Sequence, residues 1–569
     1  MKRVFIFFFV CTVLTMPSKA QERSHARSMV ISRQGIAATS QTLASQAGAQ
    51  ILARGGTAMD AAIAANAVLT VVEPMSCGMG GDLFALYYEA KSGKLSGINA
   101  SGPSAAAMTI ARLKELGHYS MPQEGIHSVT VPGCVDGWRK LHQRFGKLPW
   151  KEVFRPARYY AREGFPLTEI IQGHWREAAA KLNASEYSRS VFLRDGTAPP
   201  VGAIVRNPDL AKALDAVAEQ GADAFYKGPV ARAILATSSK LGGLLEASDL
   251  EGFAAEWVEP LSINYRGWTV YELPPNSQGL AALEMLNIFQ ELPLAQEPGG
   301  SAQVLHYQIE AQKLAYQDLR RYVADPKFFQ APVDGLLSRG YARERAKLID
   351  PDKARCDFEP GQPLPSAGDT IYLAAVDAEG NIASLIQSLY QSFGSGVAVE
   401  GYGFHLQNRG ALFEFDESHP NALAPKKRPF HTIIPAFMEK DSLRMGFGIM
   451  GGLNQAQAHA QFVSNVVDFG MNIQAALEAP RFTKLNFSGC DVMVEGRIPP
   501  TVREALAAKG HQVEMLGDFS SWMGGGQVAM RDEAAGVNFA ASSPRKDGAA
   551  VPQPDPYFST PQSARRGRR

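Results

Sequence analysis

Residues 368–381 read Gly-Asp-Thr-Ile-Tyr-Leu-Ala-Ala-Val-Asp-Ala-Glu-Gly-Asn. The stretch places Thr370 at the head of a predicted strand, directly after a loop rich in Pro, Ser and Gly at 361–368. Within an intact chain, such a threonine is an ordinary residue of a turn that leads into a strand. Cleavage of the Asp369–Thr370 bond would give Thr370 a free α-amine, with a pKa of about 7.7–8.0, beside its own hydroxyl. One residue then supplies both nucleophile and base, which is the N-terminal-threonine form of covalent catalysis.

Further motifs follow one another in a fixed order over most of the chain. They lie at residues 43–48, 55–62, 72–82, 131–138, 274–279, 427–430, 450–452 and 479–482. Together with Gly-Asp-Thr at 368–370, they resemble the γ-glutamyltransferases (glutathione hydrolases), which are N-terminal-nucleophile hydrolases. The departures described below are typical of a divergent branch that includes cephalosporin-acylase-like members.

Local patterns predict a mixture of helices and strands. Alternating residues and turn signals predict strands at 84–88, 371–376, 382–388, 492–495, 527–530 and 537–541. Helical spacing predicts helices at 42–67, 302–322 and 455–467. The resemblance implies how these elements are arranged. It implies an α+β fold, a four-layer αββα sandwich of the N-terminal-nucleophile hydrolase type.

The resemblance also implies that the precursor cleaves itself at Asp369–Thr370. The Thr370 hydroxyl attacks the carbonyl of Asp369, and water opens the resulting ester. We expect a large subunit of residues 21–369 and a small subunit of residues 370–569, held together as a heterodimer in one αββα unit. Thr370 then attacks a small-molecule γ-glutamyl or related acyl amide. The acyl-enzyme is released by water, as in a glutathione hydrolase, or by an amine acceptor, as in a transpeptidase.

The remaining site residues are also implied by the resemblance. Gly451 and Gly452 match a glycine pair whose backbone forms the oxyanion hole, and glycine lets backbone approach a substrate closely. Ser388 aligns with a threonine that hydrogen-bonds the nucleophile, and a serine keeps the hydroxyl. Substrate contacts are expected from two pairs of residues. These are Asn408 and Arg409, which align with an Asn-Gln pair, and His431 and Thr432, which align with a Ser-Ser pair that contacts the substrate carboxylate.

Three positions depart from the family pattern. Asn99 stands where an arginine pairs with the α-carboxylate of a γ-glutamyl group, and Leu412 stands where an acidic residue holds its α-ammonium. Tyr390 replaces an asparagine-type ligand. Losing both charged partners removes charge-assisted hydrogen bonds of about 1.5–3 kcal/mol each. We hypothesise that amide hydrolysis is kept while glutathione activity is weak, unless Arg409 recruits the carboxylate instead.

Composition and the N-terminus indicate a soluble exported protein. The 569 residues are 45% hydrophobic and 20% charged with a net charge of +1, which gives no electrostatic case for nucleic acid or anionic membrane. Residues 1–20 have the pattern of a signal peptide cleaved after Ala20, so we expect a periplasmic or secreted protein with no membrane segment in its mature form. Residues 21–33 are predicted to be disordered, and the basic residues 565–569 to be a solvated tail.

The cysteines and histidines show no metal-site pattern. After removal of Cys11 with the signal, Cys77, Cys134, Cys356 and Cys490 remain, and four cysteines allow three pairings between which the sequence does not choose. The chain contains no Cys-x-x-Cys and no His-Glu-x-x-His. We therefore predict no metal and no other cofactor.

Motifs of other enzyme classes are incomplete or absent in the sequence. Residues 446–451 form a Gly-x-Gly-x-x-Gly, which imitates a dinucleotide-binding loop, but no clear βαβ unit follows. No Gly-x-Ser-x-Gly elbow supports a serine hydrolase. A cephalosporin or glutaryl-amide acylase remains an alternative, as does an exported binding protein that has the same fold and altered catalysis.

Overall fold

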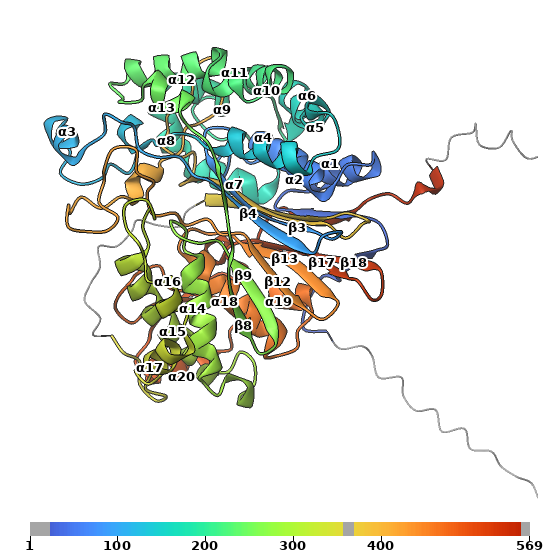
Figure 1. The fold of residues 1–569 in the computed structure, drawn as a ribbon, viewed down its shortest axis with the longest axis vertical. Helices are drawn as coiled ribbons and strands as arrows, with labels where there is room; N and C mark the ends of the chain where they lie inside the picture. Colours follow the sequence, from blue (N-terminus) through green and yellow to red (C-terminus); the bar gives the residue numbers. More distant parts are fainter. Residues whose placement is uncertain (1–22, 357–368, 559–569) are drawn as a thin grey trace, which may run out of the picture.

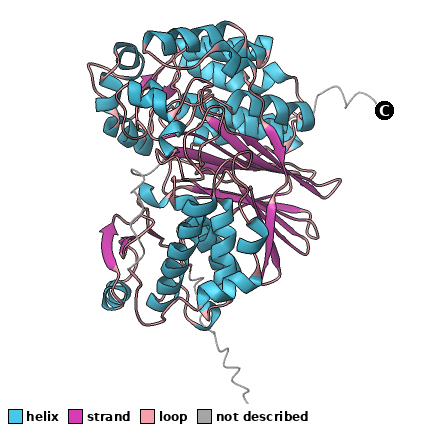
Figure 2. Cartoon of the chain, turned by 60° about the vertical axis from the view of Figure 1, so that its left-hand side comes forward, coloured by secondary structure: helices cyan, strands magenta, loops and turns pink. Residues whose placement is uncertain are grey.

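Two seven-stranded antiparallel sheets lie face to face in the computed structural model, which describes residues 23–356 and 369–558. Helices cover the outer face of each sheet, so the four-layer αββα sandwich predicted from the sequence is confirmed (Figures 1 and 2). In spatial order, the first sheet consists of β1 (Val30–Ser32), β18 (Val537–Ser542), β17 (Gly526–Asp532), β13 (Leu443–Ile449), β12 (Ala436–Lys440), β9 (Trp268–Glu272) and β8 (Leu261–Tyr265). The second consists of β19 (Ala549–Pro552), β2 (Ile36–Thr39), β10 (Asp369–Val376), β11 (Ile382–Tyr390), β3 (Asp82–Glu89), β4 (Lys94–Ala100) and β7 (Glu256–Val258).

Helices from the first half of the chain pack on the second sheet, at the top of Figure 1. They are α1 (Thr42–Ala53), α2 (Ala58–Val72), α3 (Ile110–Glu115), α4 (Cys134–Phe145), α5 (Trp150–Val153), α6 (Arg155–Glu163), α7 (Glu169–Glu177), α8 (Ala179–Asn183), α9 (Glu186–Phe192), α10 (Pro208–Gln220), α11 (Asp223–Tyr226), α12 (Pro229–Lys240) and α13 (Ala247–Glu251).

The other helices lie on the side of the first sheet, at the bottom of Figure 1. They are α14 (Gly279–Gln290), α15 (Ala302–Tyr322), α16 (Val333–Leu336), α17 (Arg339–Ala346), α18 (Asn454–Val467), α19 (Ile473–Glu478) and α20 (Pro500–Ala508). Of these, α20 packs on α15 and not on the sheet itself. Short strands lie outside the two main sheets: β14 (Phe482–Thr483), β15 (Asp491–Glu495) and β16 (Gln512–Leu516) form one small sheet, and β5 (Phe165–Pro166) and β6 (Ile204–Val205) form another.

Strand β10 is buried on both faces, which explains its almost continuous run of apolar residues. Ile371 and Leu373 pack into the core beneath the helices, whereas Tyr372 and Ala374 pack into the core between the two sheets. Side chains alternate along a strand, so residues 384, 386 and 388 of β11 share one face, and Ile386 places that face between the sheets. Thr370 and Ser388 therefore lie at the end of the sandwich, where the two sheets and the upper helices meet.

One predicted helix is divided in two. The sequence predicts a helix over 42–67, but α1 ends at Ala53 and α2 begins at Ala58. Gly55 adopts φ 85°, a left-handed conformation that ends α1. Thr57 then caps α2, because its hydroxyl accepts the Asp60 N–H while the Asp60 carboxylate accepts the Thr57 N–H. The small-residue periodicity continues across this break, so the capping residues and not the period decide where the helix stops.

The prediction that residues 21–33 are disordered is wrong for their second part. Val30–Ser32 form β1, which pairs with β18 at the edge of the first sheet. Just before it, the backbone N–H groups of Ala26 and Arg27 donate to the carboxylate of Glu478 at 2.6 and 3.0 Å. These partners lie at the other end of the chain, and for that reason local composition does not reveal them.

Several predictions fall outside the described residues. They concern the signal peptide at 1–20, the loop at 361–368 and the basic tail at 565–569. Across 23–356 and 369–558, the structure has no helix that combines the length and apolar character needed to cross a membrane.

Candidate active site

Thr370 lies where the pairing of β10 with β11 is interrupted. Asp369 pairs with Tyr390 and Ile371 with Gln387, so the register shifts across Thr370. Such a bulge re-aims a side chain at the end of a strand. Thr370 is almost fully buried in the uncut chain, and its neighbours decide what its hydroxyl can reach.

Ser388 forms hydrogen bonds both to Thr370, the predicted nucleophile, and to the Asp369 carbonyl of the bond that Thr370 is expected to cut. The Thr370 hydroxyl donates to Ser388 Oγ at 3.1 Å, and the Ser388 hydroxyl donates to the carbonyl oxygen of Asp369 at 2.9 Å. Two more donors hold Ser388 Oγ in place, a guanidinium N–H of Arg409 and the backbone N–H of Tyr390, both at 2.8 Å. The three donors share the two lone pairs of Ser388 Oγ, so its single proton is directed at the Asp369 carbonyl.

Arg409 is fully buried behind Ser388. Its second terminal nitrogen donates to the Thr432 hydroxyl at 2.7 Å, and its guanidinium lies 4.8 Å from the centre of the Tyr390 ring. Burial lowers the pKa of Arg409 to about 10, while Asp82 and Tyr390 act in the opposite direction. The guanidinium therefore stays charged at neutral pH and fixes the orientation of Ser388.

His431 is also fully buried, in contact with Asp82. Its Nδ1 accepts the backbone N–H of Ile433 at 3.3 Å, which leaves Nε2–H to donate to Asp82 at 3.0 Å. Burial, and then the nearby Arg409 and Arg428, hold the pKa of His431 well below its usual range, so the ring is neutral. In this position the imidazole supports the buried network around Arg409.

The two predicted oxyanion-hole glycines form the turn between β13 and α18. Gly451 adopts φ 123° and Gly452 φ 60°, which are conformations that favour glycine. A Cβ on Gly451 would lie 3.2 Å from Asn454 Nδ2, and the carbonyl of Gly452 accepts Gln278 Nε2 at 2.8 Å. The turn is thus tightly held, and it brings backbone close to the end of β10.

A cavity of about 660 Å³ opens at Thr370, within the usual size range for small-molecule sites. It is lined by Glu124, His174, Glu177, Ala178, Ala180, Lys181, Ala184, Asp369, Thr370, Gln391, Ser392, Met450, Gly451, Ser521, Trp522 and Lys546. Thr370 lies in β10 of the second sheet and Gly451 follows β13 of the first sheet, and the sandwich brings them to the same cavity.

The other predicted site residues are buried behind this wall. They are Ser388, Asn408, Arg409, His431, Thr432 and Gly452. Asn408 reaches the cavity indirectly: its amide donates to the Gln391 side chain at 2.8 Å and accepts the Gln391 backbone N–H at 3.1 Å.

The three positions that depart from the family pattern are occupied by internal contacts. Asn99 donates to Asn276 Oδ1 at 2.8 Å and accepts the Ser101 hydroxyl at 2.7 Å. Leu412 packs in the core beneath the lower helices, and Tyr390 lies under the Arg409 guanidinium. None of the three lines the cavity described above.

A cluster of charged residues that the sequence did not reveal lies around Asp369. Ser76 donates to the Asp369 carboxylate at 2.8 Å, and Lys546 Nζ lies 3.6 Å from the same oxygen. Glu73 lies close by, and its carboxylate accepts the hydroxyl of Ser40. Only the antiparallel pairing of β19 with β2 brings Lys546, just before β19, near this site.

Burial and mutual attraction set the charges in this cluster. Burial alone would raise the pKa of Asp369, but Lys546, His174 and the Ser76 hydroxyl hold it below its usual value. Burial would lower the pKa of Lys546, but Asp369 and Glu73 raise it. Burial raises the pKa of Glu73 to about 7. The uncut chain thus holds an ionised Asp369–Lys546 pair at neutral pH.

The Gly-x-Gly-x-x-Gly at 446–451 is not part of a dinucleotide-binding unit. It begins inside β13, which pairs antiparallel with both β12 and β17. A βαβ unit requires parallel strands, so this interpretation is excluded for the stretch.

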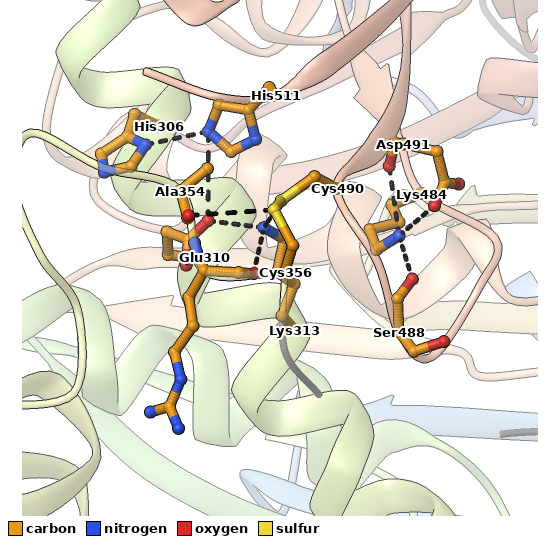
Figure 3. The surroundings of a disulfide bond; sticks show 11 residues. His306, Glu310, Lys313, Ala354, Cys356, Lys484, Ser488, Cys490, Asp491 and His511 are labelled. Atoms are coloured by element: carbon orange, nitrogen blue, oxygen red, sulfur yellow. Dashed lines mark hydrogen bonds and ion pairs between the residues drawn. A yellow bond between two sulfur atoms is a disulfide. The ribbon is translucent and has the colours of Figure 1, made fainter. Parts of the chain in front are cut away.

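Of the cysteine pairings left open by the sequence, the structure contains Cys356–Cys490 (Figure 3). Cys77 and Cys134 are buried free thiols. The bonded cysteines lie on opposite sides of the predicted cleavage site.

A buried group next to this disulfide has the residue types of a metal site, namely His306, Glu310 and His511 (Figure 3). The two rings bond each other at 2.9 Å, and Lys313 Nζ lies 2.6 Å from a Glu310 oxygen. This ammonium already balances the single carboxylate, so the group does not favour a cation.

Comparison with known proteins gives one consistent family. The family model described as gamma-glutamyltranspeptidase matches residues 44–553. The chain is 37% identical to the glutathione hydrolase-like YwrD proenzyme of Bacillus subtilis (strain 168) over 514 residues, which cover 90% of this chain and 96% of that protein. It is 34% identical to the oxamate amidohydrolase proenzyme of Klebsiella pneumoniae over 534 residues, which cover 92% of this chain and 99% of that protein.

The fold comparison agrees. A crystal structure of cephalosporin acylase from Bacillus halodurans superposes with a TM-score of 0.88 at 41% identity, covering 95% of this chain and 100% of that one.

Proposed function

Because the chain belongs to the gamma-glutamyltranspeptidase family, we propose that it is a self-cleaving amidohydrolase whose nucleophile is Thr370. The observation that carries this proposal is the chain of hydrogen bonds from the Thr370 hydroxyl through Ser388 to the Asp369 carbonyl. The nucleophile, the donor to the developing oxyanion and the scissile bond are thus adjacent in the uncut chain.

Self-cleavage begins with attack of Thr370 Oγ1 on the carbonyl carbon of Asp369. Charge develops on the carbonyl oxygen, where Ser388 donates its proton, and Arg409 keeps Ser388 in this orientation. The peptide C–N bond breaks, the proton released from the Thr370 hydroxyl passes to the Thr370 nitrogen, and an ester remains. Water hydrolyses the ester, giving a large subunit that ends at Asp369 and a small subunit that begins at Thr370.

Turnover uses the same hydroxyl with the new α-amine as base. The amine takes the hydroxyl proton as Oγ1 attacks the substrate carbonyl, and the turn that reaches the cavity at Gly451 supplies backbone donors to the oxyanion. The leaving amine receives the proton and an acyl-enzyme forms. Water then completes hydrolysis, or an amine acceptor completes transpeptidation.

The substrate is an acyl amide other than glutathione, which should be hydrolysed poorly. Asn99 and Leu412 supply no charge to a zwitterionic glutamyl end and are engaged inside the protein. The names of the relatives include oxamate amidohydrolase and cephalosporin acylase, which supports acyl groups other than γ-glutamyl. An acylase is therefore the favoured form of this activity.

We place the enzyme outside the cytoplasm, in the periplasm or secreted. The signal-peptide pattern at 1–20 supports this location, and so does the Cys356–Cys490 bond, because disulfides persist in oxidising compartments.

The deciding experiment is the intact mass and N-terminal sequence of the purified mature protein. Two chains, one of which begins at Thr370, are expected. A single uncut chain from residue 21 with no amidase activity would contradict the proposal and favour an exported binding protein of the same fold.

A further inference from the structure

The uncut chain presents the acyl group of its own Asp369 to Thr370. The Asp369 carbonyl accepts the Ser388 hydroxyl, and its side-chain carboxylate lies 2.8 Å from Ser76 Oγ and 3.6 Å from Lys546 Nζ. Two carbons separate this carboxylate from the carbonyl that Thr370 attacks. Asp369, Thr370 and Lys546 all line the same cavity.

We propose that Lys546 selects substrates by binding a carboxylate on the acyl group, and that the preferred acyl group is a four-carbon dicarboxylic one of the succinyl type. The proposal rests on the function proposed above and adds the substrate class. Asp369 then acts in the precursor as an internal stand-in for this acyl group.

Cleavage removes the carboxylate partner of Lys546 but not the lysine. Asp369 becomes the end of the large subunit and must vacate the space at Thr370 before any substrate carbonyl can enter. Lys546 belongs to the small subunit and stays where the turn around Gly525 holds it, since a Cβ on Gly525 would lie 2.5 Å from Lys546 Cγ. Glu73 remains beside Lys546, and in the uncut chain burial raises its pKa to about 7.

The preferred length of the substrate's acyl group follows from the same geometry. A succinyl group places its carboxylate two carbons from the scissile carbonyl, as Asp369 does. A γ-glutamyl group has three carbons between these groups and carries an α-ammonium, which would approach Lys546 unfavourably. The site therefore favours the shorter and wholly anionic acyl group.

The other cations at this end of the molecule have different partners. Lys181 lines the cavity but donates to the backbone carbonyls of Ser392 and Gly394 at 2.9 and 3.2 Å. Arg409 is buried and holds Ser388. Lys546 is the cation whose nearest carboxylate leaves on cleavage.

The test compares p-nitroanilides of succinate, succinamate, glutarate and γ-glutamate with the processed wild-type enzyme. Succinamate matches succinate in shape but lacks the charge. We expect kcat/KM for the succinyl compound to exceed that for the succinamyl compound by about 10- to 100-fold, the range of a charged hydrogen bond. Equal values would overturn the proposal.

Substitutions test whether Lys546 causes the preference for the succinyl over the succinamyl compound. Lys546→Met should bring the succinyl-to-succinamyl ratio close to one, and Lys546→Arg should retain a preference. Lys181→Met is the matched control, because it removes another lysine of the same cavity and should preserve the ratio. A ratio that survives in Lys546→Met contradicts the proposal. If Lys546→Met is not processed, competitive inhibition of the wild-type enzyme by succinate, stronger than by succinamate by the same factor, replaces it.

The experiments distinguish failure of the proposed amidohydrolase function from failure of the proposed role of Lys546. A wild-type chain that neither cleaves itself nor hydrolyses any of these amides rejects that function. Succinate binding to the uncut Asp369→Ala chain, measured by calorimetry, still decides the role of Lys546. Binding that disappears when Lys546→Met is added supports it, and absence of binding to the Asp369→Ala chain rejects it.

Discussion

The Ser388 hydroxyl oxygen lies 2.9 Å from the carbonyl oxygen of Asp369. This contact joins β11 to the residue before the predicted nucleophile, and it directs a proton at the oxygen on which charge develops during self-cleavage. Since Ser388 Oγ also accepts the Thr370 hydroxyl, one side chain positions both reacting groups.

Ser388→Ala should slow self-cleavage by about 10²- to 10³-fold, the usual effect of removing one oxyanion donor. Ser388→Thr should restore it, because threonine keeps the hydroxyl. The measurement is the time course of two-chain formation on denaturing gels. Ser384→Ala is the control, since Ser384 lies on the same face of β11 but bonds the Tyr372 hydroxyl and the Ala436 carbonyl. Equal slowing in both variants would contradict a specific role for Ser388.

Thr370→Ala should abolish both cleavage and turnover, because it removes the hydroxyl that attacks the Asp369 carbonyl. Thr370→Ser should keep both, with a lower rate. Intact mass spectrometry and an amidase assay on the same preparation check this. Cleavage at 369–370 in the alanine variant would show that another group or a protease cuts the chain.

Arg409→Gln should lower kcat more than it changes KM. The guanidinium bonds Ser388 and Thr432 and is buried behind the cavity wall, so it acts through Ser388. Kinetics with a series of anionic and neutral acyl amides distinguishes a role in orienting Ser388 from direct contact with a substrate carboxylate. A rise in KM confined to anionic acyl groups would instead mean that Arg409 contacts the substrate carboxylate, as the sequence suggested.

The two subunits should remain covalently linked after self-cleavage. Cys356 belongs to the large subunit and Cys490 to the small one (Figure 3). A denaturing gel without reductant should show one band that reductant splits into two. Cys356→Ser should give two bands without reductant, whereas Cys77→Ser, which removes a free thiol, should still give one. Without denaturant the subunits should stay together even when reduced, because β10 pairs with β2 and β11 with β3 across the subunit boundary.

Glu73 should make the uncut protein less stable as pH rises from about 4.5 to about 7. Burial raises its pKa from 4.5 to about 7, so in this window the folded chain holds a proton that the unfolded chain has released. Raising the pH therefore favours unfolding, and the effect stops above pH 7, where both states are ionised. Glu73→Gln lacks this proton equilibrium.

The measurement is the Tm of the uncut Thr370→Ala chain with and without Glu73→Gln at several pH values. The Tm of the Gln variant minus that of its parent should increase with pH up to about 7 and then level off. Parallel curves would mean that Glu73 is ionised at all these pH values.

By itself, the sequence determined the local framework around Thr370. Apolar alternation in β10 and β11 and the turn between them are local properties, and α15 has the predicted bounds of 302–322 because its period is uninterrupted. The order of the motifs was enough to identify the family and, through it, the four layers. Local patterns were less reliable at Gly55, where a cap interrupts a continuing period.

Only the tertiary structure decided which side chains meet at the end of β10. Lys546 and Asp369 are far apart in the chain and come together because β19 and β10 both pair with β2. The same packing buries Arg409 and His431 behind the cavity and selects Cys490 as the partner of Cys356. Periodicity in the sequence indicates which face of a single segment is buried. Charge pairing and access to a cavity depend instead on segments that are distant in the sequence and close in space. For this reason the Lys546–Asp369 pair and the residues lining the cavity could not be predicted from the order of residues.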